Sequence, residues 1–203
     1  ILIQGKPIVS EPTIFKQLLV ARFNLLGEFV RLIDMEIENA RRGIVSGITI
    51  KLNNLEDEIL IAKLYDASNA GVRVKLLVRS ICRLIPGVPG QSENITAHRI
   101  VDRFLEHGRI FIFENAGDPL IYLGSADWMR RNIYHRIEVC FPLKDVVLRD
   151  QLLKMIDLQL RDNIKGVTID NHLANVRNTA ETGTRSQVEI YKLLRSAGDH
   201  LIN

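Results

Sequence analysis

The first regular pattern in the chain is a helical spacing of apolar residues between positions 24 and 42. These side chains recur every three or four residues, at Phe29, Val30, Ile33 and Ile37. Such a period places them on one face of a helix, which can then be buried. Asn24 is a preferred capping residue at the start, and Gly43 is a typical stop at the end. We therefore predict a helix over residues 24–42.

Strand-like and helical segments alternate after this helix. Residues 47–52 (GITIKL) and 72–78 (VRVKLLV) have the apolar, β-branched pattern of strands, and residues 56–70 between them return to helical spacing. This order favours two neighbouring parallel strands, and ligands of open α/β sheets bind beyond the carboxyl ends of such strands. Arg79 directly follows the second strand. The pattern predicts an α/β fold with Arg79 at its ligand-binding edge.

Residues 80–94 interrupt the pattern and include the sequence PGVPG. Rigid prolines and permissive glycines suit a backbone that approaches a ligand, although a plain surface connection has the same composition. We predict a functional loop beside Arg79, followed by a short helix at about residues 100–106.

The second half of the chain contains predicted strands and two further helices. The strands are expected at residues 109–113, 120–124 and 136–141, and the helices at 145–162 and 186–198. Ser186 and Glu189 have the spacing of a capping box. Residues 163–184 are weakly patterned, and residues 1–20 indicate a loop leading into a short strand.

Composition narrows the class of protein. The chain has 203 residues, of which 46% are hydrophobic and 25% charged, as in a folded globular protein. Cys82 and Cys140 form neither a disulfide framework nor a metal-binding spacing, which favours a cytoplasmic protein with free thiols. The apolar runs are strand-sized, far below the ~20 residues that span a bilayer. Because the chain begins with Ile1, we expect it to be part of a longer protein.

Positive charge is concentrated in the middle of the chain. The net charge is +3, but residues 73–109 alone hold seven Lys or Arg and three acidic residues. His107 and Arg109 lie at the start of a predicted strand, where a two-residue period places both on one face. An imidazole beside a guanidinium suits phosphoryl transfer, which needs cations and sometimes a proton donor. The simpler interpretation of His107 is a cap or a surface histidine, and that of Arg79 is a solvated arginine at the end of a strand.

Two further places are candidates for phosphate contact. Lys51 and Asn53 close the first strand, so they approach the same edge as Arg79, although an ordinary turn explains them equally well. Ser125 follows another strand in a small-residue turn, and Arg131 adds positive charge nearby. The alternative there is a basic surface with a packing tryptophan, Trp128.

Three long segments together resemble the C-terminal half of the large bacterial-type polyphosphate kinases. They are LLVRSICRLIPGVPGQSENI, RIVDRFLEHGRIFIF and YLGSADWMRRN, and LIDMEIENARRG and KLNN fit the same family upstream. The resemblance runs from about residue 18 to residue 142. It implies a phospholipase-D-like α/β domain with a mixed sheet flanked by helices. Residues 21–203 would form this C-terminal catalytic domain, and residues 1–20 would end the preceding catalytic domain or link to it.

The resemblance also implies an activity. The family reversibly transfers the terminal phosphate of ATP to inorganic polyphosphate through a phosphohistidine in the preceding domain, with Mg²⁺ whose ligands are expected outside this chain. By this resemblance Arg79 and His107 would contact ATP, with His107 catalytic as a proton donor. From their positions in the sequence, Arg109 is a further candidate for binding ATP or phosphate, and Lys51, Asn53, Ser125 and Arg131 are candidates for lining a phosphate channel. ATP or ADP, polyphosphate and the preceding domain would be the partners. The intact enzyme would be a homo-oligomer that needs no nucleic acid, with membrane association left open.

The phospholipase-D pattern is altered in this chain. His107, Arg109, Glu114 and Gly124–Ser125 correspond to His-x-Lys, Asp and Gly-Ser, with Arg in place of Lys, which puts Glu114 in doubt. Without the preceding domain we expect the fragment to be inactive. Two alternatives stay open: an anion-binding module for polyphosphate or nucleic acid without catalysis, and a phospholipase-D-type phosphodiesterase that uses His107 as the nucleophile.

Overall fold

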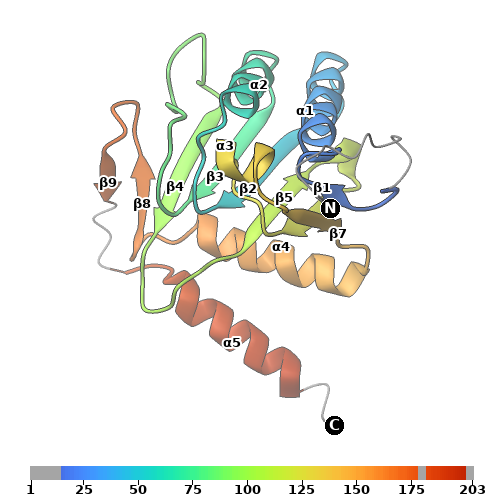
Figure 1. Cartoon of the computed structure of the whole chain (residues 1–203). Helices are drawn as coiled ribbons and strands as arrows, with labels where there is room; N and C mark the ends of the chain where they lie inside the picture. Colours follow the sequence, from blue (N-terminus) through green and yellow to red (C-terminus); the bar gives the residue numbers. More distant parts are fainter. Residues whose placement is uncertain (1–14, 178–181, 200–203) are drawn as a thin grey trace.

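A computed structural model describes residues 15–177 and 182–199 and contains one nine-stranded mixed sheet, ordered β1-β7-β6-β5-β2-β3-β4-β8-β9 (Figure 1). The strands are β1 (Leu19–Val20), β2 (Gly47–Leu52), β3 (Arg73–Val78), β4 (Ile95–Ile100), β5 (Arg109–Phe113), β6 (Leu120–Gly124), β7 (Val139–Pro142), β8 (Gly166–Ile169) and β9 (Asn175–Arg177). The predicted α/β fold with a mixed sheet is confirmed.

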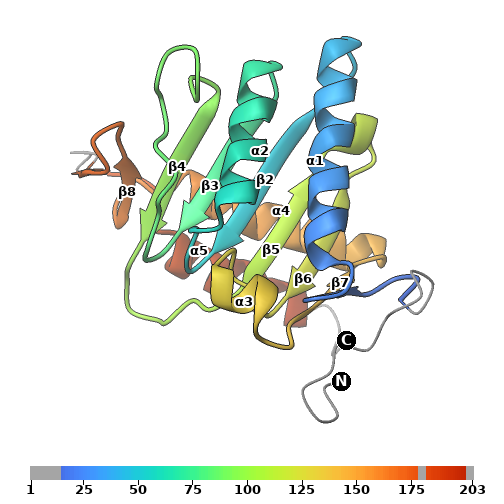
Figure 2. The same ribbon diagram turned by 45° about the horizontal axis from the view of Figure 1, so that its top comes forward.

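Helices cover both faces of this sheet. Helices α1 (Leu25–Arg41) and α2 (Glu58–Asn69) lie side by side on one face, and α4 (Val146–Leu160) crosses the other (Figure 2). The short helix α3 (Arg130–Tyr134) lies at one edge, a 3-10 turn covers Asn115–Gly117, and α5 (Ser186–Asp199) projects beyond α4. Gly43 and Gly71 both have positive φ where α1 and α2 end, as the predicted helix stops require.

Strand directions gather several chain ends at one edge of the sheet. β2, β3 and β4 are parallel, whereas β5 runs antiparallel to β2. The carboxyl ends of the three parallel strands and the start of β5 therefore meet at the same edge. Arg79 follows β3 and Arg109 opens β5, so both lie there, as predicted for Arg79.

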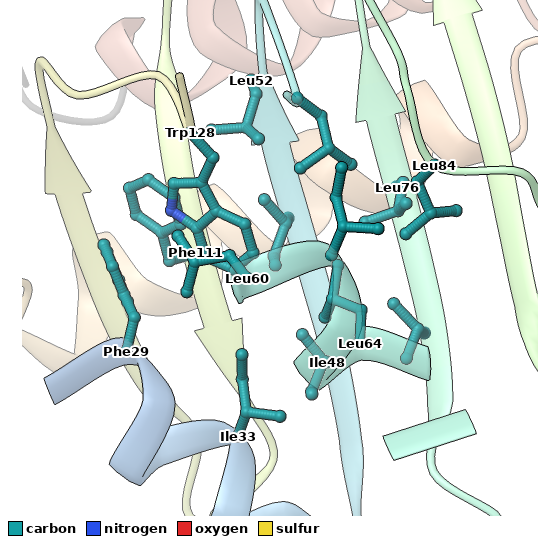
Figure 3. Packing of buried hydrophobic residues seen from close by; sticks show 14 of the residues in the cluster. Phe29, Ile33, Ile48, Leu52, Leu60, Leu64, Leu76, Leu84, Phe111 and Trp128 are labelled. Atoms are coloured by element: carbon teal, nitrogen blue, oxygen red, sulfur yellow. The ribbon is translucent and has the colours of Figure 1, made fainter. Parts of the chain in front are cut away.

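The larger hydrophobic core lies between the sheet and helices α1 and α2. Phe29 of α1 and Phe111 of β5 have ring centroids 4.5 Å apart, and the Trp128 ring stacks 5.7 Å from Phe111 (Figure 3). Alternate residues of β5 face opposite ways, so Ile110 and Ile112 join a second, smaller apolar cluster with Ile156 of α4. Trp128 is fully buried, as a packing tryptophan would be.

Two sequence predictions are wrong in the region after β3. The expected helix at residues 100–106 is absent, because residues 95–100 pair with β3 and β8 as strand β4 and residues 101–108 have no regular structure. The weakly patterned residues 163–184, for which no element was predicted, include β8 and β9. The expected capping box of α5 is replaced, since Ser186 donates both its backbone N–H and its hydroxyl to Asp162 Oδ2, at 2.7 and 2.6 Å.

The proline- and glycine-rich turns also lie elsewhere than expected. Asn94, which ends this loop, donates to Ser68 near the C-terminus of α2, and β4 starts directly afterwards. The loop thus returns the chain to the opposite edge of the sheet so that β4 can run parallel to β3. Only its first residues are near Arg79. Residues 1–14 of the predicted N-terminal loop lie outside the described part, whereas the short strand appears as β1.

Candidate phosphate-binding site

His107 and Arg109 are in direct contact at the site edge, as their spacing predicted. Nη1 of Arg109 lies 2.8 Å from Nδ1 of His107 and donates to the backbone oxygen of His107, also at 2.8 Å. His107 is exposed, whereas the Arg109 side chain is largely covered. Nη2 of Arg109 also lies 3.3 Å from Nε2 of His107, so the guanidinium contacts both ring nitrogens of a side chain that is otherwise exposed.

Asp127 holds this arginine from the other side, a role that the sequence pattern did not reveal. Its carboxylate accepts from Nε and Nη2 of Arg109, at 3.2 and 3.3 Å. It also accepts from the backbone N–H of Asn53 and from Nδ2 of Asn54, each at 2.9 Å. Burial acts to raise the pKa of Asp127, but the hydrogen bonds from Arg109, Asn54 and Asn53 outweigh it and lower the pKa. Asp127 is thus an anionic support for Arg109.

Arg79 lies beside the end of β2. Its Nε donates to Oδ1 of buried Asn53 at 2.8 Å. Within residues 15–177 and 182–199, the Nη1 and Nη2 groups of Arg79 form no hydrogen bond or ion pair with another side chain. Arg79 lines a small hollow together with Lys51 and Glu106, and a neighbouring hollow contains His107, Lys51 and Glu106. Because both hollows are lined by Lys51 and Glu106, Arg79 and His107 lie on either side of the Lys51–Glu106 pair.

Lys51 is engaged within the protein. Its ammonium group forms an ion pair with Glu106 and donates to Oε1 of Gln159 of α4 at 2.8 Å. Burial lowers the pKa of Lys51, and the Glu106 carboxylate works against that shift. The predicted phosphate contact of Lys51 would have to compete with these interactions.

Ser125 and Arg131 differ in their surroundings. The Ser125 hydroxyl donates to Glu138, which also accepts from Nδ2 of Asn132 at 2.6 Å. Arg131 is exposed on α3. Of these two predicted channel residues, Arg131 presents its side chain to solvent, whereas Ser125 is tied to a buried carboxylate.

Glu114 is far from His107, which settles the doubt raised by the altered motif. It follows the far end of β5 and lies against Gly47 at the start of β2, the edge opposite to the site. Five residues of extended strand separate it from His107. The acidic residue near Arg109 is Asp127, which comes from the turn after β6.

No cluster of three or more metal-ligating side chains occurs within residues 15–177 and 182–199. Glu106, which precedes His107, is paired with Lys51, and Asp127 is paired with Arg109. These residues therefore do not fit a Mg²⁺ site. Among the described residues, no helix is both long and apolar enough to cross a bilayer.

Comparisons with known proteins give one consistent result. Residues 18–188 match the family model of the polyphosphate kinase C-terminal domain 2. Polyphosphate kinases of Klebsiella pneumoniae and Escherichia coli (strain K12) are 49% and 48% identical to the chain over 187 residues. This is 91% of the chain but 27% of each relative, so the chain spans about a quarter of their length.

Two solved structures resemble the fold. A polyphosphate kinase from Porphyromonas gingivalis superposes with a TM-score of 0.89 and 44% identity, covering 94% of this chain and 30% of that chain. A phospholipase D family member from Salmonella typhimurium superposes with a TM-score of 0.55 and 14% identity, covering 79% of this chain and 97% of that chain. The second likeness concerns the fold alone, and it confirms the predicted phospholipase-D-like architecture.

Proposed function

The chain belongs to the polyphosphate kinase C-terminal domain 2 family, and from this premise we propose that it supplies one half of the active site of a polyphosphate kinase. The reaction is the reversible transfer of the terminal phosphate of ATP to inorganic polyphosphate. The phosphorylated histidine and the Mg²⁺ ligands belong to a preceding domain. The intact enzyme is a cytoplasmic homo-oligomer.

The observation that carries the proposal is the support given to His107. Asp127 fixes Arg109, and Arg109 contacts the imidazole of His107 at the open edge of the sheet. An imidazole held in this way meets a phosphate group without first losing side-chain freedom. Histidine side chains also exchange protons near neutral pH. His107 therefore acts as the proton donor to the leaving oxygen rather than as the group that is phosphorylated.

Arg79 has the complementary role. The Nη1 and Nη2 groups of its guanidinium form a planar fork that matches two oxygens of a phosphate group. Positive charge at this position offsets the charge that develops on the transferring phosphoryl group. We assign the phosphate contacts to Arg79 and His107, with Arg131 as an outer contact. Arg109 contributes chiefly by holding His107, because its donors already face His107 and Asp127.

The test uses the full-length enzyme and separates proton transfer from covalent catalysis. We expect His107→Ala to lower turnover about 10²- to 10⁴-fold, the usual contribution of a general acid or base. Arg79→Lys should also remain impaired, because an ammonium group cannot make the two-point contact. His172→Ala, which changes an exposed histidine in the turn between β8 and β9, is the matched control and should be nearly neutral.

Radioactive phosphate from ATP then locates the covalent intermediate. After a brief exposure, the label should be on a histidine of the preceding domain in the wild type and in the His107→Ala variant. Label on His107 that disappears in the alanine variant would favour the phosphodiesterase-like nucleophile instead. Full turnover without His107 and Arg79 would reduce this domain to an anion-binding module.

A further inference from the structure

The segment that carries His107 has no regular secondary structure of its own. Residues 101–108 connect β4 to β5 without helix or strand hydrogen bonds. Several of their side chains, including Phe104 and Leu105, are exposed. A segment of this kind would move unless other elements held it. The precision of His107 therefore depends on contacts from outside the segment.

Helix α5 provides one set of these contacts through its first turn. The side chain of Gln187 donates to the backbone oxygen of Phe104 and accepts from its backbone N–H, both at 2.8 Å. This is the pairing that a neighbouring strand would give. Just before the helix, Arg185 binds Asp102 through two parallel hydrogen bonds of 2.8 and 2.7 Å. Two separate points of the segment are thus fixed to the start of α5.

Glu106, immediately before His107, joins three elements. Its Oε1 accepts from Nε2 of Gln187 at 3.0 Å, and its Oε2 accepts from Nε2 of Gln159 at 2.6 Å and from the ammonium of Lys51. Gln159 and Gln187 are only 5% and 8% exposed, so water competes little for these bonds. The carboxylate of Glu106 therefore connects β2, α4 and α5 at the residue next to His107.

This cluster of Lys51, Glu106, Gln159 and Gln187 lies between the two proposed phosphate-binding residues. Lys51, Glu106 and Gln159 line both the hollow that contains Arg79 and the hollow that contains His107. Each hydrogen bond is directional, so the cluster constrains geometry as well as holding the surfaces together. Its members form hydrogen bonds mainly with one another and with residues 101–108. Their function is therefore to set the separation between His107 and Arg79.

We propose that Glu106 and Gln187 are positioning residues, which fix His107 at the correct distance from Arg79 and make α5 part of the catalytic apparatus. The proposal rests on the function proposed above for His107. Neither residue touches the phosphate. They act through His107, so a small displacement of the segment is enough to impair transfer, because misplacement of a reacting group by about 1 Å can cost 10²-fold in rate.

The test is a double-mutant cycle in the full-length enzyme. We expect Gln187→Ala and Glu106→Gln each to lower kcat about 10- to 100-fold while the KM for ATP changes less than about threefold. In a His107→Ala background, the same changes should lower kcat less than about twofold, because the residue through which they act is gone. Lys192→Ala, an exposed change on the same helix, is the control.

Gln187→Met separates hydrogen bonding from packing, since methionine keeps the length and burial of the side chain but not its amide. It should be as impaired as Gln187→Ala. Normal kcat in the methionine variant would overturn the proposal. So would equal losses in the wild-type and His107→Ala backgrounds, which would indicate general damage to the fold. Glu106→Gln preserves the shape of the side chain. If Gln187→Ala fails to fold, the kcat of Glu106→Gln tests the proposal instead.

The controls distinguish this failure from failure of the proposed function. If His107→Ala alone leaves turnover unchanged, the role of His107 is wrong and the positioning proposal falls with it. If His107→Ala is impaired but Gln187→Ala and Glu106→Gln are not, only the positioning proposal is wrong. A loss that is confined to the His107-containing background supports both.

Discussion

The face of the sheet under α1 and α2 is closed by large apolar side chains, whereas the face under α4 passes into a buried polar cluster near His107. On the first face, Phe29, Phe111 and Trp128 pack together with relative exposures of zero. On the second, a small apolar cluster around Ile156 gives way to Gln159 and the polar residues that hold the segment 101–108. The face under α1 and α2 contributes buried apolar surface, and the face under α4 contributes directional hydrogen bonds.

The difference shows how the fold divides stability and precision. Burying apolar surface stabilises the chain at roughly 25 cal/mol per Å², with little dependence on the exact position of each atom. A hydrogen bond contributes only about 1 kcal/mol net to stability, but it is lost when its geometry changes. A buried polar group that is left without a hydrogen-bond partner destabilises the fold. The apolar face is suited to holding the sheet, and the polar face to placing His107.

The largest expected effect is therefore on the apolar face. Phe111→Ala should lower the free energy of unfolding of this chain by about 3–5 kcal/mol, because it removes a ring between Phe29 and Trp128 and leaves a cavity. Denaturant unfolding measures this, with the single tryptophan, Trp128, as the fluorescent reporter. Phe141→Ala, at a phenylalanine that is 46% exposed, is the matched control. Equal losses for the two would contradict the assigned core.

The elements that form the apolar face were predicted well from the sequence, because burial of apolar residues on one face leaves a periodic pattern. The periods of apolar residues mark α1, β2, α2, β3, β5 and β6, since each of these elements buries one stripe or face against the same core. It failed for β4, whose sequence ITAHRI places polar His98 and Arg99 in a strand. Pairing with β3 and β8 decides that segment, and those partners are distant in sequence. Local pattern cannot reveal such a contact.

The candidate site was predictable to a similar extent. His107 and Arg109 were predicted to meet because they are two residues apart at the start of a predicted strand. They do meet, although β5 begins only at Arg109 and His107 precedes it. Asp127 and Gln187 were not, because each reaches its partner from another part of the chain. Buried Asp and Gln also give no periodic signal, since a single polar residue resembles a surface position. The glycine-rich loop was misplaced because its direction depends on β4.

The next largest effect is expected at the polar junction of α4 and α5. The carboxylate of Asp162 accepts hydrogen bonds from the backbone N–H groups of Lys165 and Gly166 and from both donors of Ser186. Asp162→Ala should lower the free energy of unfolding by about 2–3 kcal/mol, since several buried donors lose their acceptor together. Calorimetry or denaturant unfolding measures the change.

Asp157 provides the comparison for this substitution. It is an exposed aspartate of α4 that pairs with Arg161 one helical turn away. Asp157→Ala should cost no more than about 0.5 kcal/mol, as exposed pairs of this spacing usually do. If the two substitutions cost the same, the hydrogen bonds to Asp162 do not hold α5 to the domain.

The smallest expected effect concerns acid, to which the two faces should respond in opposite directions. The hydrogen bond from Arg185 lowers the pKa of Asp102, although burial opposes it. At Asp162 burial favours a higher pKa, but the bonds from Ser186, Lys165 and Gly166 lower it. A lowered carboxyl pKa means stabilisation that is present above the unfolded value of about 3.9 and lost as the pH falls through the folded pKa. The anchorage of α5 should therefore weaken below about pH 4.

Glu36 in α1 provides the opposite case, because burial raises its pKa despite hydrogen bonds from Asn115 and Gly47, and Glu114 nearby adds to the increase. A raised carboxyl pKa favours the folded state at low pH, and that contribution is lost as the pH rises through the folded pKa. Amide hydrogen exchange at pH 6 and pH 3, corrected for intrinsic rates, compares the two helices. We expect α5 to lose protection, by less than about tenfold, while α1 does not. Earlier loss in α1 would mean that the apolar face, and not the polar cluster, is the acid-sensitive part of the domain.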